Sequence, residues 1–229
     1  MDGVLFAAFA LGYALLLGWG AVLVRRHGMR APADVLLPVI LALVYDNGVL
    51  AAGRLIGEGP LLEGLNVARY WLHALLTPLL VLFAWDAMGR AGLAAARRSW
   101  AWALAVALYL AAVVVELAGH VLGLSLRPRR QYGVLSYAVQ EPAAGPPVMI
   151  LVVSAVLLLA AAVVWWKQRW PWFAVGVVLM SAGGAVPLPL DSAAVTNAFE
   201  FLLLASLLAT KQRQDRLAAG AASPIASPH

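Results

Sequence analysis

The sequence predicts an all-α, polytopic integral membrane protein with seven transmembrane helices. Of its 229 residues, 63% are hydrophobic and only 12% are charged, against about 25% charged residues in a soluble domain. The mean hydropathy is +0.86. Apolar runs of about 20 residues, each long enough to cross a hydrocarbon core of about 30 Å, recur along the chain. No segment alternates in polarity every second residue, as membrane β-strands do.

The first predicted helix covers residues 4–24. No basic residue precedes its apolar stretch, and Arg25, Arg26 and Arg30 follow it. Because this order is the reverse of that in a cleaved signal peptide, we expect a retained span with its N-terminus outside. The second helix covers 35–53. The third covers 69–88, and Pro78 predicts a kink there because it cannot donate a backbone hydrogen bond.

The remaining spans surround one long loop. The fourth helix covers 100–124, and the loop at 125–146 has the length of a lid or binding element. The fifth helix covers 147–166. The sixth, at 171–186, is short, contains Gly183-Gly184 and ends at Pro187 and Pro189. The seventh covers 192–210, so the transmembrane domain is 1–212 and residues 213–229 are expected to be a disordered cytoplasmic tail.

Basic residues set the expected orientation. Of the 16 Lys and Arg residues, the five at 54, 69, 127, 129 and 130 fall on one side of the spans and the other eleven on the opposite side. The positive-inside rule makes the richer side cytoplasmic, so we expect an N-out/C-in, multi-pass protein of the inner (plasma) membrane. The net charge of +5 therefore does not indicate a nucleic-acid partner. The absence of cysteine excludes disulfides and thiolate sites.

Three carboxylates lie inside these apolar segments: Asp46, Glu116 and Glu200. A helical rise of about 1.5 Å per residue places all three about 12–13 Å below the outer edge. His73 and His120 lie at about 6 Å by the same measure. A charge near the bilayer centre costs at least about 2.5–3.5 kcal/mol, so several at one level indicate a site or a path.

Helical spacing aligns these residues with further polar side chains. Residues three, four or seven apart share a helix face. The aligned groups are Glu116 with His120, Asn197 with Glu200, Asn47 with Arg54, and Arg69 with His73 and Thr77. Structural roles are the alternatives: Glu116–His120 as a local ion pair, Asn197 as an interhelical contact and His73 as a donor to a backbone carbonyl. Asp86 is expected to pair with Arg90 on the helix surface.

Three acids in a low dielectric cannot all be ionised together. A protonated carboxyl beside an ionised one is the pairing that general acid–base catalysis uses, and it also suits proton relay. A bound cation is a third way to accommodate three acids, and Glu116, His120 and His73 are the candidate metal ligands. No spacing is diagnostic of a metal, so the cofactor is unknown and a divalent metal is one option.

Two segments of the chain are distinctive: VYDNGVLAAGRLIGEG, at 44–59, and RYWLHALLTPLL, at 69–80. They resemble a family of small, uncharacterised bacterial membrane proteins with seven helices. The resemblance covers the second and third helices and implies the seven-helix build without an activity. In build and buried acids alone, the chain is also similar to small membrane-bound terpene cyclases, and fold analogy does not establish function.

Our leading hypothesis is a membrane-embedded enzyme that acts on a lipid or isoprenoid by acid–base chemistry in the outer half of the bilayer. The expected catalytic residues are Asp46, His73, Glu116, His120 and Glu200. The expected substrate-binding residues are Asn47, Arg54, Arg69, Thr77 and Asn197. The basic loop at 125–146 is a candidate for recognising an anionic or polar head group. The alternatives are a proton- or ion-coupled transporter and a haem protein ligated by His73 and His120.

Overall fold

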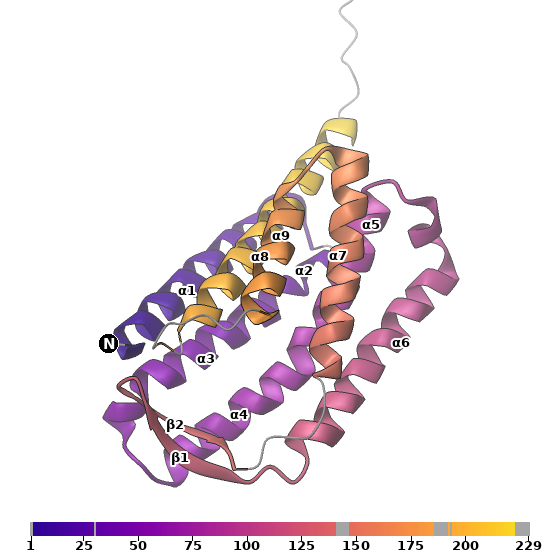
Figure 1. The fold of residues 1–229 in the computed structure, drawn as a ribbon. Helices are drawn as coiled ribbons and strands as arrows, with labels where there is room; N and C mark the ends of the chain where they lie inside the picture. The colour runs from indigo at the N-terminus through magenta and orange to yellow at the C-terminus, as the bar shows by residue number, and fades with distance from the viewer. Residues whose placement is uncertain (1, 30, 141–146, 186–191, 193, 223–229) are drawn as a thin grey trace, which may run out of the picture.

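The computed structural model describes residues 2–29, 31–140, 147–185, 192 and 194–222. Within them, the chain forms a bundle of seven long helical segments and one small β-hairpin (Figure 1). The predicted all-α class is thereby confirmed. The helical elements are α1 (Asp2–His27), α2 (Ala31–Asp34), α3 (Leu36–Ile56), α4 (Pro60–Leu76), η1 (Thr77–Leu79), α5 (Leu80–Arg90), η2 (Ala94–Arg97), α6 (Ser99–Glu116), η3 (Leu117–Val121), α7 (Val148–Gln168), α8 (Trp172–Ala185) and α9 (Val195–Ala222).

Five segments are long and apolar enough to cross a membrane, judged by length and composition: 2–27, 32–56, 60–90, 99–121 and 148–168. A shorter apolar helix covers Trp172–Gly184. Many large apolar side chains on these helices face outward, among them Leu11, Leu15 and Trp166, each about 70% exposed or more. Such a surface fits a hydrocarbon solvent better than water.

The third helical segment starts earlier than predicted. α4 begins at Pro60, which occupies the first helical position, where its missing N–H costs nothing. Because Glu63 and Asn66 lower the local hydropathy, the apolar pattern did not predict this first part of the helix. The predicted break at Pro78 is confirmed as the 3-10 turn η1, which separates α4 from α5.

The last helix is also longer than predicted. α9 continues to Ala222, so residues 213–222, expected to be disordered, are helical. The reason is burial: Gln214 and Asp215 are at most 3% exposed and bond to other helices. Residues 223–229 lie outside the described part of the chain, as do Pro187 and Pro189, the expected end of the sixth helix.

The predicted loop at 125–146 contains an antiparallel hairpin of β1 (Leu126–Gln131) and β2 (Val134–Val139). Its two-residue turn, Tyr132-Gly133, has φ values of 52° and 80°. Positive φ at both turn residues matches the right-handed twist of paired strands, although tyrosine is an uncommon residue there. Residues 141–146 lie outside the described chain.

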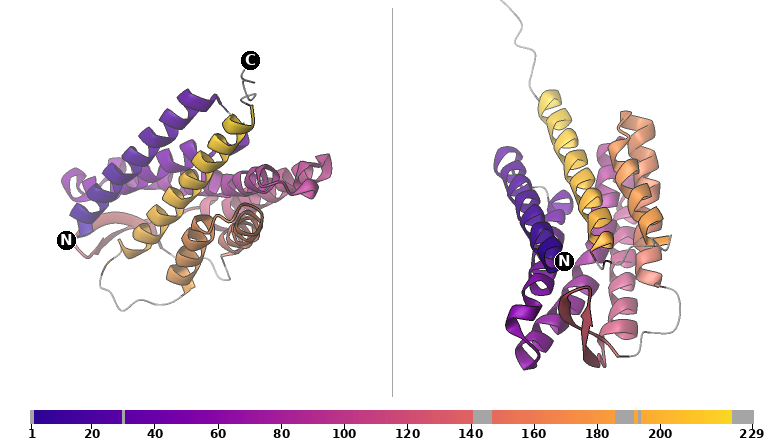
Figure 2. Two further views of the ribbon diagram at one scale, coloured as in Figure 1. Left: turned by 90° about the horizontal axis from the view of Figure 1, so that it is seen from above. Right: turned by 60° about the vertical axis from the view of Figure 1, so that its left-hand side comes forward.

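The helices pack in an order that joins the two ends of the chain. α1 contacts α3 and α9, α9 contacts α8, and α7 contacts both α8 and α5. Figure 2 shows α9 running between α1 and the pair α7–α8, while α6 lies at one edge of the bundle in Figure 1. Tyr13, Phe83, Phe173 and Leu207 are among the side chains that form the core of the bundle. The hairpin caps the end at which α1 begins and α3 ends.

Candidate functional site

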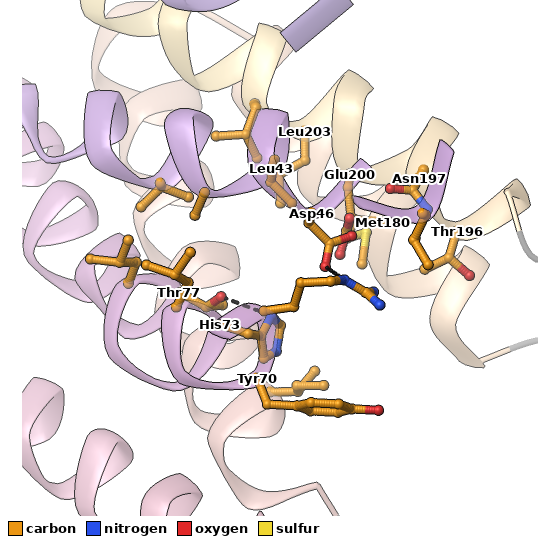
Figure 3. Close-up of a pocket in the computed structure, with 18 of the residues that line it drawn as sticks. Leu43, Asp46, Tyr70, His73, Thr77, Met180, Thr196, Asn197, Glu200 and Leu203 are labelled. Carbon is orange, nitrogen blue, oxygen red and sulfur yellow. Dashed lines mark hydrogen bonds and ion pairs between the residues drawn. The ribbon is translucent and has the colours of Figure 1, made fainter. Parts of the chain in front are cut away.

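A cavity of about 430 Å³ lies between α3, α4, α7, α8, α9 and the hairpin. Figure 3 shows Asp46 from α3, His73 and Thr77 from the α4–η1 segment, and Glu200 and Asn197 from α9 around it. The structure therefore brings together polar residues that are more than 100 positions apart in the sequence. These residues belong to the second, third and seventh predicted helices, whereas Glu116 and His120 of the fourth do not line the cavity.

Arg69 ties α4 to α3 at this cavity. Its Nε donates to Asp46 Oδ1 at 2.7 Å, and its Nη1 donates to Asn66 Oδ1 at 2.7 Å. Asn66 is fully buried and is itself held by a bond from Nδ2 to the carbonyl of Leu62. Because a guanidinium fixed at two of its nitrogens has little freedom, Asp46 keeps a permanent positive partner.

His73 and Thr77 lie one helical turn apart where α4 ends. Thr77 Oγ1 is 3.2 Å from His73 Nδ1, so one nitrogen of the ring is engaged and the other is available. The imidazole is exposed to the cavity rather than packed among apolar side chains. The 3-10 turn at Pro78 ends the α-helix just below it, and such breaks in spanning helices are tolerated where backbone lines a cavity.

Glu200 is the second carboxyl of the cavity. Asp46 is close enough for its charge to act on Glu200. Within the described residues, however, Glu200 makes no hydrogen bond or ion pair. One cavity thus holds an ion-paired carboxylate, Asp46, and a second carboxyl without a cation beside it.

Asn197, one turn before Glu200, is 8% exposed, and its Oδ1 has no partner among the described residues. The Asn197 carbonyl accepts a bond from the hydroxyl of Tyr13 at 3.3 Å, which fixes the start of α9 against α1. A buried polar atom without a partner is costly. An orphaned amide that lines a cavity is therefore a candidate contact for a ligand.

The cavity lining changes from polar to apolar along its length. Moving from Asp46 toward the start of α3, the lining residues are Leu43 and Val39; moving from Glu200 along α9, they are Leu203 and Leu204. The opposite, hairpin end carries Arg129, Gln131 and Ser136 beside the apolar Phe6 and Val134. A ligand with a polar head and an apolar tail matches this gradient.

The hairpin forms the rim of the cavity. Tyr137 OH accepts a bond from the backbone N–H of Gly59 at 3.0 Å, which anchors β2 to the α3–α4 turn. Gly53 of α3 touches the carbonyl of Leu135, where a side chain would overlap it. Arg129 lines the cavity, whereas Arg130 pairs with Glu58 at 3.0 Å. Of these two arginines, Arg129 is therefore the better candidate for the expected binding role of this segment.

Several predicted site residues do not line the cavity. Glu116 and His120 pair with each other at 3.4 Å, beside the π-helical turn η3. Asn47 is fully buried and donates to the carbonyl of Leu43 at 2.9 Å. Arg54 borders a separate pocket with Gly57 and the hairpin turn. Glu116–His120 has the geometry of the local ion pair named above as the alternative.

Metal ligation gains no geometric support. Across the described ranges, no three His, Asp or Glu side chains are grouped so that they could hold one metal ion. His73 lies in the cavity, whereas Glu116 and His120 do not line it. The three candidate metal ligands, and equally the two candidate haem ligands, therefore do not all line the cavity, although the charge of Glu116 acts on His73.

A second polar cluster, which the sequence did not predict, lies at the opposite end of the bundle. Lys211 is 1% exposed and binds Asp34 of α2 at 3.1 Å and Asp215 at 2.7 Å. Arg90 of α5 binds Asp215 and also approaches Asp86 at 3.8 Å, as predicted. The i,i+4 spacing of Lys211 and Asp215 could have signalled this cluster, had the segment not been assigned to a disordered tail.

Asp215 is the centre of this second cluster. Burial by itself raises the pKa of its carboxyl, but the hydrogen bond from Lys211 and the positive charges of Arg90 and Lys211 outweigh that effect, so the pKa lies below its ordinary value. Asp215 is therefore ionised at neutral pH. The cluster joins α2, α5 and α9.

The sequence matches no protein-family model and no curated protein. The resemblance noted above for residues 44–59 and 69–80 therefore stays a prediction. The geometry of the cavity is the basis for any functional assignment.

Proposed function

We propose that this protein is a membrane-embedded enzyme that acts on an amphipathic lipid or isoprenoid by acid–base chemistry. The observation that carries the proposal is a cavity that is apolar at one end and holds one ion-paired and one unpaired carboxyl at the other. The protein would span the inner (plasma) membrane with its N-terminus outside, so that the hairpin and the polar end of the cavity face the external side.

Each cavity residue has a defined part in this proposal. Asp46, which is ion-paired with Arg69, stabilises positive charge that develops on the substrate. Glu200 carries the proton and donates it, because no cation beside it favours its ionised form. His73, held through Thr77, accepts a proton through its free ring nitrogen. The proposal gives no role to Glu116, His120, Asn47 or Arg54.

The test compares lipid extracts, by mass spectrometry, from cells expressing the wild type and two isosteric variants. Glu200→Gln removes the proton donor, and we expect the product lipid to fall by at least about 100-fold, the usual contribution of general acid catalysis. Glu116→Gln makes the same change at a similar predicted depth but outside the cavity, and we expect the product to remain. Equal loss in both variants, or in neither, would contradict the proposal.

A proton- or ion-coupled transporter is the second candidate, and the second polar cluster, around Asp215, favours it. The cavity and the ion pairs of Lys211 lie at opposite ends of the bundle. With the proposed orientation, this is the arrangement expected of an outward-open state closed on its inner side. Proton flux into liposomes separates the two functions. The enzyme shows no flux, whereas a transporter shows flux that Glu200→Gln abolishes.

A further inference from the structure

Arg69 has an unused donor at the polar end of the cavity. Its Nε and Nη1 are occupied by Asp46 and Asn66. Its Nη2 makes no hydrogen bond to any residue that the structure describes. The side chain is 17% exposed and lines the cavity, so this donor is held in a fixed position by the other two bonds and is open to a ligand.

The first turn of α9 supplies a second group. Thr196 and Asn197 both line the cavity, and Figure 3 shows them together on one side of it. Asn197 is 8% exposed with Oδ1 unpartnered among the described residues, and a half-turn of the amide presents Nδ2 instead. α9 is 28 residues long, and the N-terminus of a long helix favours an anion.

Arg129 supplies a third group from a different direction. It lies on β1 and lines the cavity, and the described part of the chain offers it no ion pair. Its neighbour Arg130 is held by Glu58, and Arg127, two residues earlier on the same strand, does not line the cavity. The positive charge of Arg129 is therefore the one that the hairpin brings to this site.

We infer that the polar end of the cavity binds the phosphate group of a lipid, with Arg69, Arg129 and the first turn of α9 as its partners. Donors from three separate elements suit a tetrahedral anion with several acceptor oxygens better than a planar carboxylate with two. The charge of Asp46 is balanced by Arg69 and, with Glu200 protonated as in the proposed function, Arg129 leaves an excess positive charge for the anion. The apolar end holds the lipid chain.

This inference rests on the proposed function for the lipid's role as substrate, but binding can be measured without turnover. The purified full-length protein in detergent is titrated with phosphatidic acid and with diacylglycerol of the same acyl chains, and adducts are counted by native mass spectrometry. We expect phosphatidic acid to bind at least about tenfold more tightly, because one charge-assisted hydrogen bond contributes about 1.5–3 kcal/mol.

Two matched variants locate the site. Arg129→Gln should weaken phosphatidic acid binding about tenfold, whereas Arg127→Gln, which removes the same charge from the same strand, should leave it unchanged. Equal binding of the two lipids would overturn the inference. An equal loss in both variants would do so too, since it would show general attraction to a basic surface.

Inorganic phosphate distinguishes a lipid from a free anion. Millimolar phosphate should fail to displace phosphatidic acid. If inorganic phosphate displaced phosphatidic acid at an equal concentration of the two, the site would take free phosphate and the lipid assignment would be overturned. Glu200→Gln separates this inference from the proposed function. If phosphatidic acid still binds more tightly than diacylglycerol but Glu200→Gln has no effect on the product lipid, only the enzymatic proposal fails. If Glu200→Gln abolishes the product but the two lipids bind equally, only this inference fails.

Discussion

The position of Arg69 depends on two bonds that the sequence did not indicate. Asn66 lies outside the predicted third helix, yet it is fully buried and accepts from Nη1. Asp46 accepts from Nε. Together they fix the orientation of the guanidinium, so Arg69 links α3 to α4 and, in our proposal, also contacts the ligand.

We predict that Asp46→Asn lowers the free energy of unfolding by about 2 kcal/mol. Removing one partner of a fully buried ion pair costs about 3–5 kcal/mol, and the loss is smaller here because both side chains are partly exposed. The midpoint of thermal unfolding in detergent measures this loss. The double variant Asp46→Asn/Arg69→Gln should recover part of it, since no unpaired charge remains. Purely additive losses would show that the pair is not coupled.

Asp215 gives the protein a predicted response to acid. Because its pKa is lower in the folded than in the unfolded state, its contribution to stability is present above the unfolded value of about 3.9 and is lost as pH falls below it. Asp215→Asn should therefore unfold at a lower temperature than the wild type at pH 7, and the difference should shrink below about pH 4. A constant difference from pH 7 to pH 3 would contradict this account.

At the scale of elements, hydropathy predicted the helices where composition was uniform and failed where buried polar residues interrupted it. α1, α3, α7 and α8 begin within about three residues of their predicted starts. α4 begins nine residues earlier than predicted and α9 ends twelve residues later, because the buried polar residues in these segments, such as Asn66 and Lys211, are stabilised by tertiary partners. Such partners cannot be read from local sequence.

The hairpin was missed for a different reason. Its strands are short and its turn is Tyr132-Gly133 rather than Asn-Gly or Asp-Gly, so its turn signal is weak. Its position depends on tertiary contacts with Gly53 and Gly59, which lie far away in the sequence. Only the basic character of the rim could be predicted.

We predict that Gly53→Ala displaces the hairpin, because the added Cβ overlaps the carbonyl of Leu135. Limited trypsin digestion should cut after Arg129 or Arg130 at least several-fold faster than in the wild type. Gly48→Ala is the matched control on the same helix, since no atom lies within 4 Å of a Cβ placed there. Similar cleavage rates in the two variants would mean that α3 does not hold the hairpin.

At the scale of the whole molecule, the two ends of the bundle differ in kind. One end holds an open cavity with polar groups that have unused capacity. The other is closed by the ion pairs of Lys211 and Arg90. Depth along the helices predicted that Asp46 and Glu200 share a level, but it could not predict which way each helix faces. Glu116 has a similar predicted depth and nevertheless lies outside the cavity.

The most direct test of an outward-facing cavity uses the absence of native cysteine. Glu200→Cys places a thiol in the cavity, and Leu202→Cys places one on an outer surface of the same helix, where Leu202 is 47% exposed. Intact cells are treated with a membrane-impermeant thiol reagent, which requires water for the thiolate to form. We predict that position 200 is labelled from outside while position 202, which we expect to face lipid, is not. No labelling at position 200, or labelling only in inverted vesicles, would contradict the account.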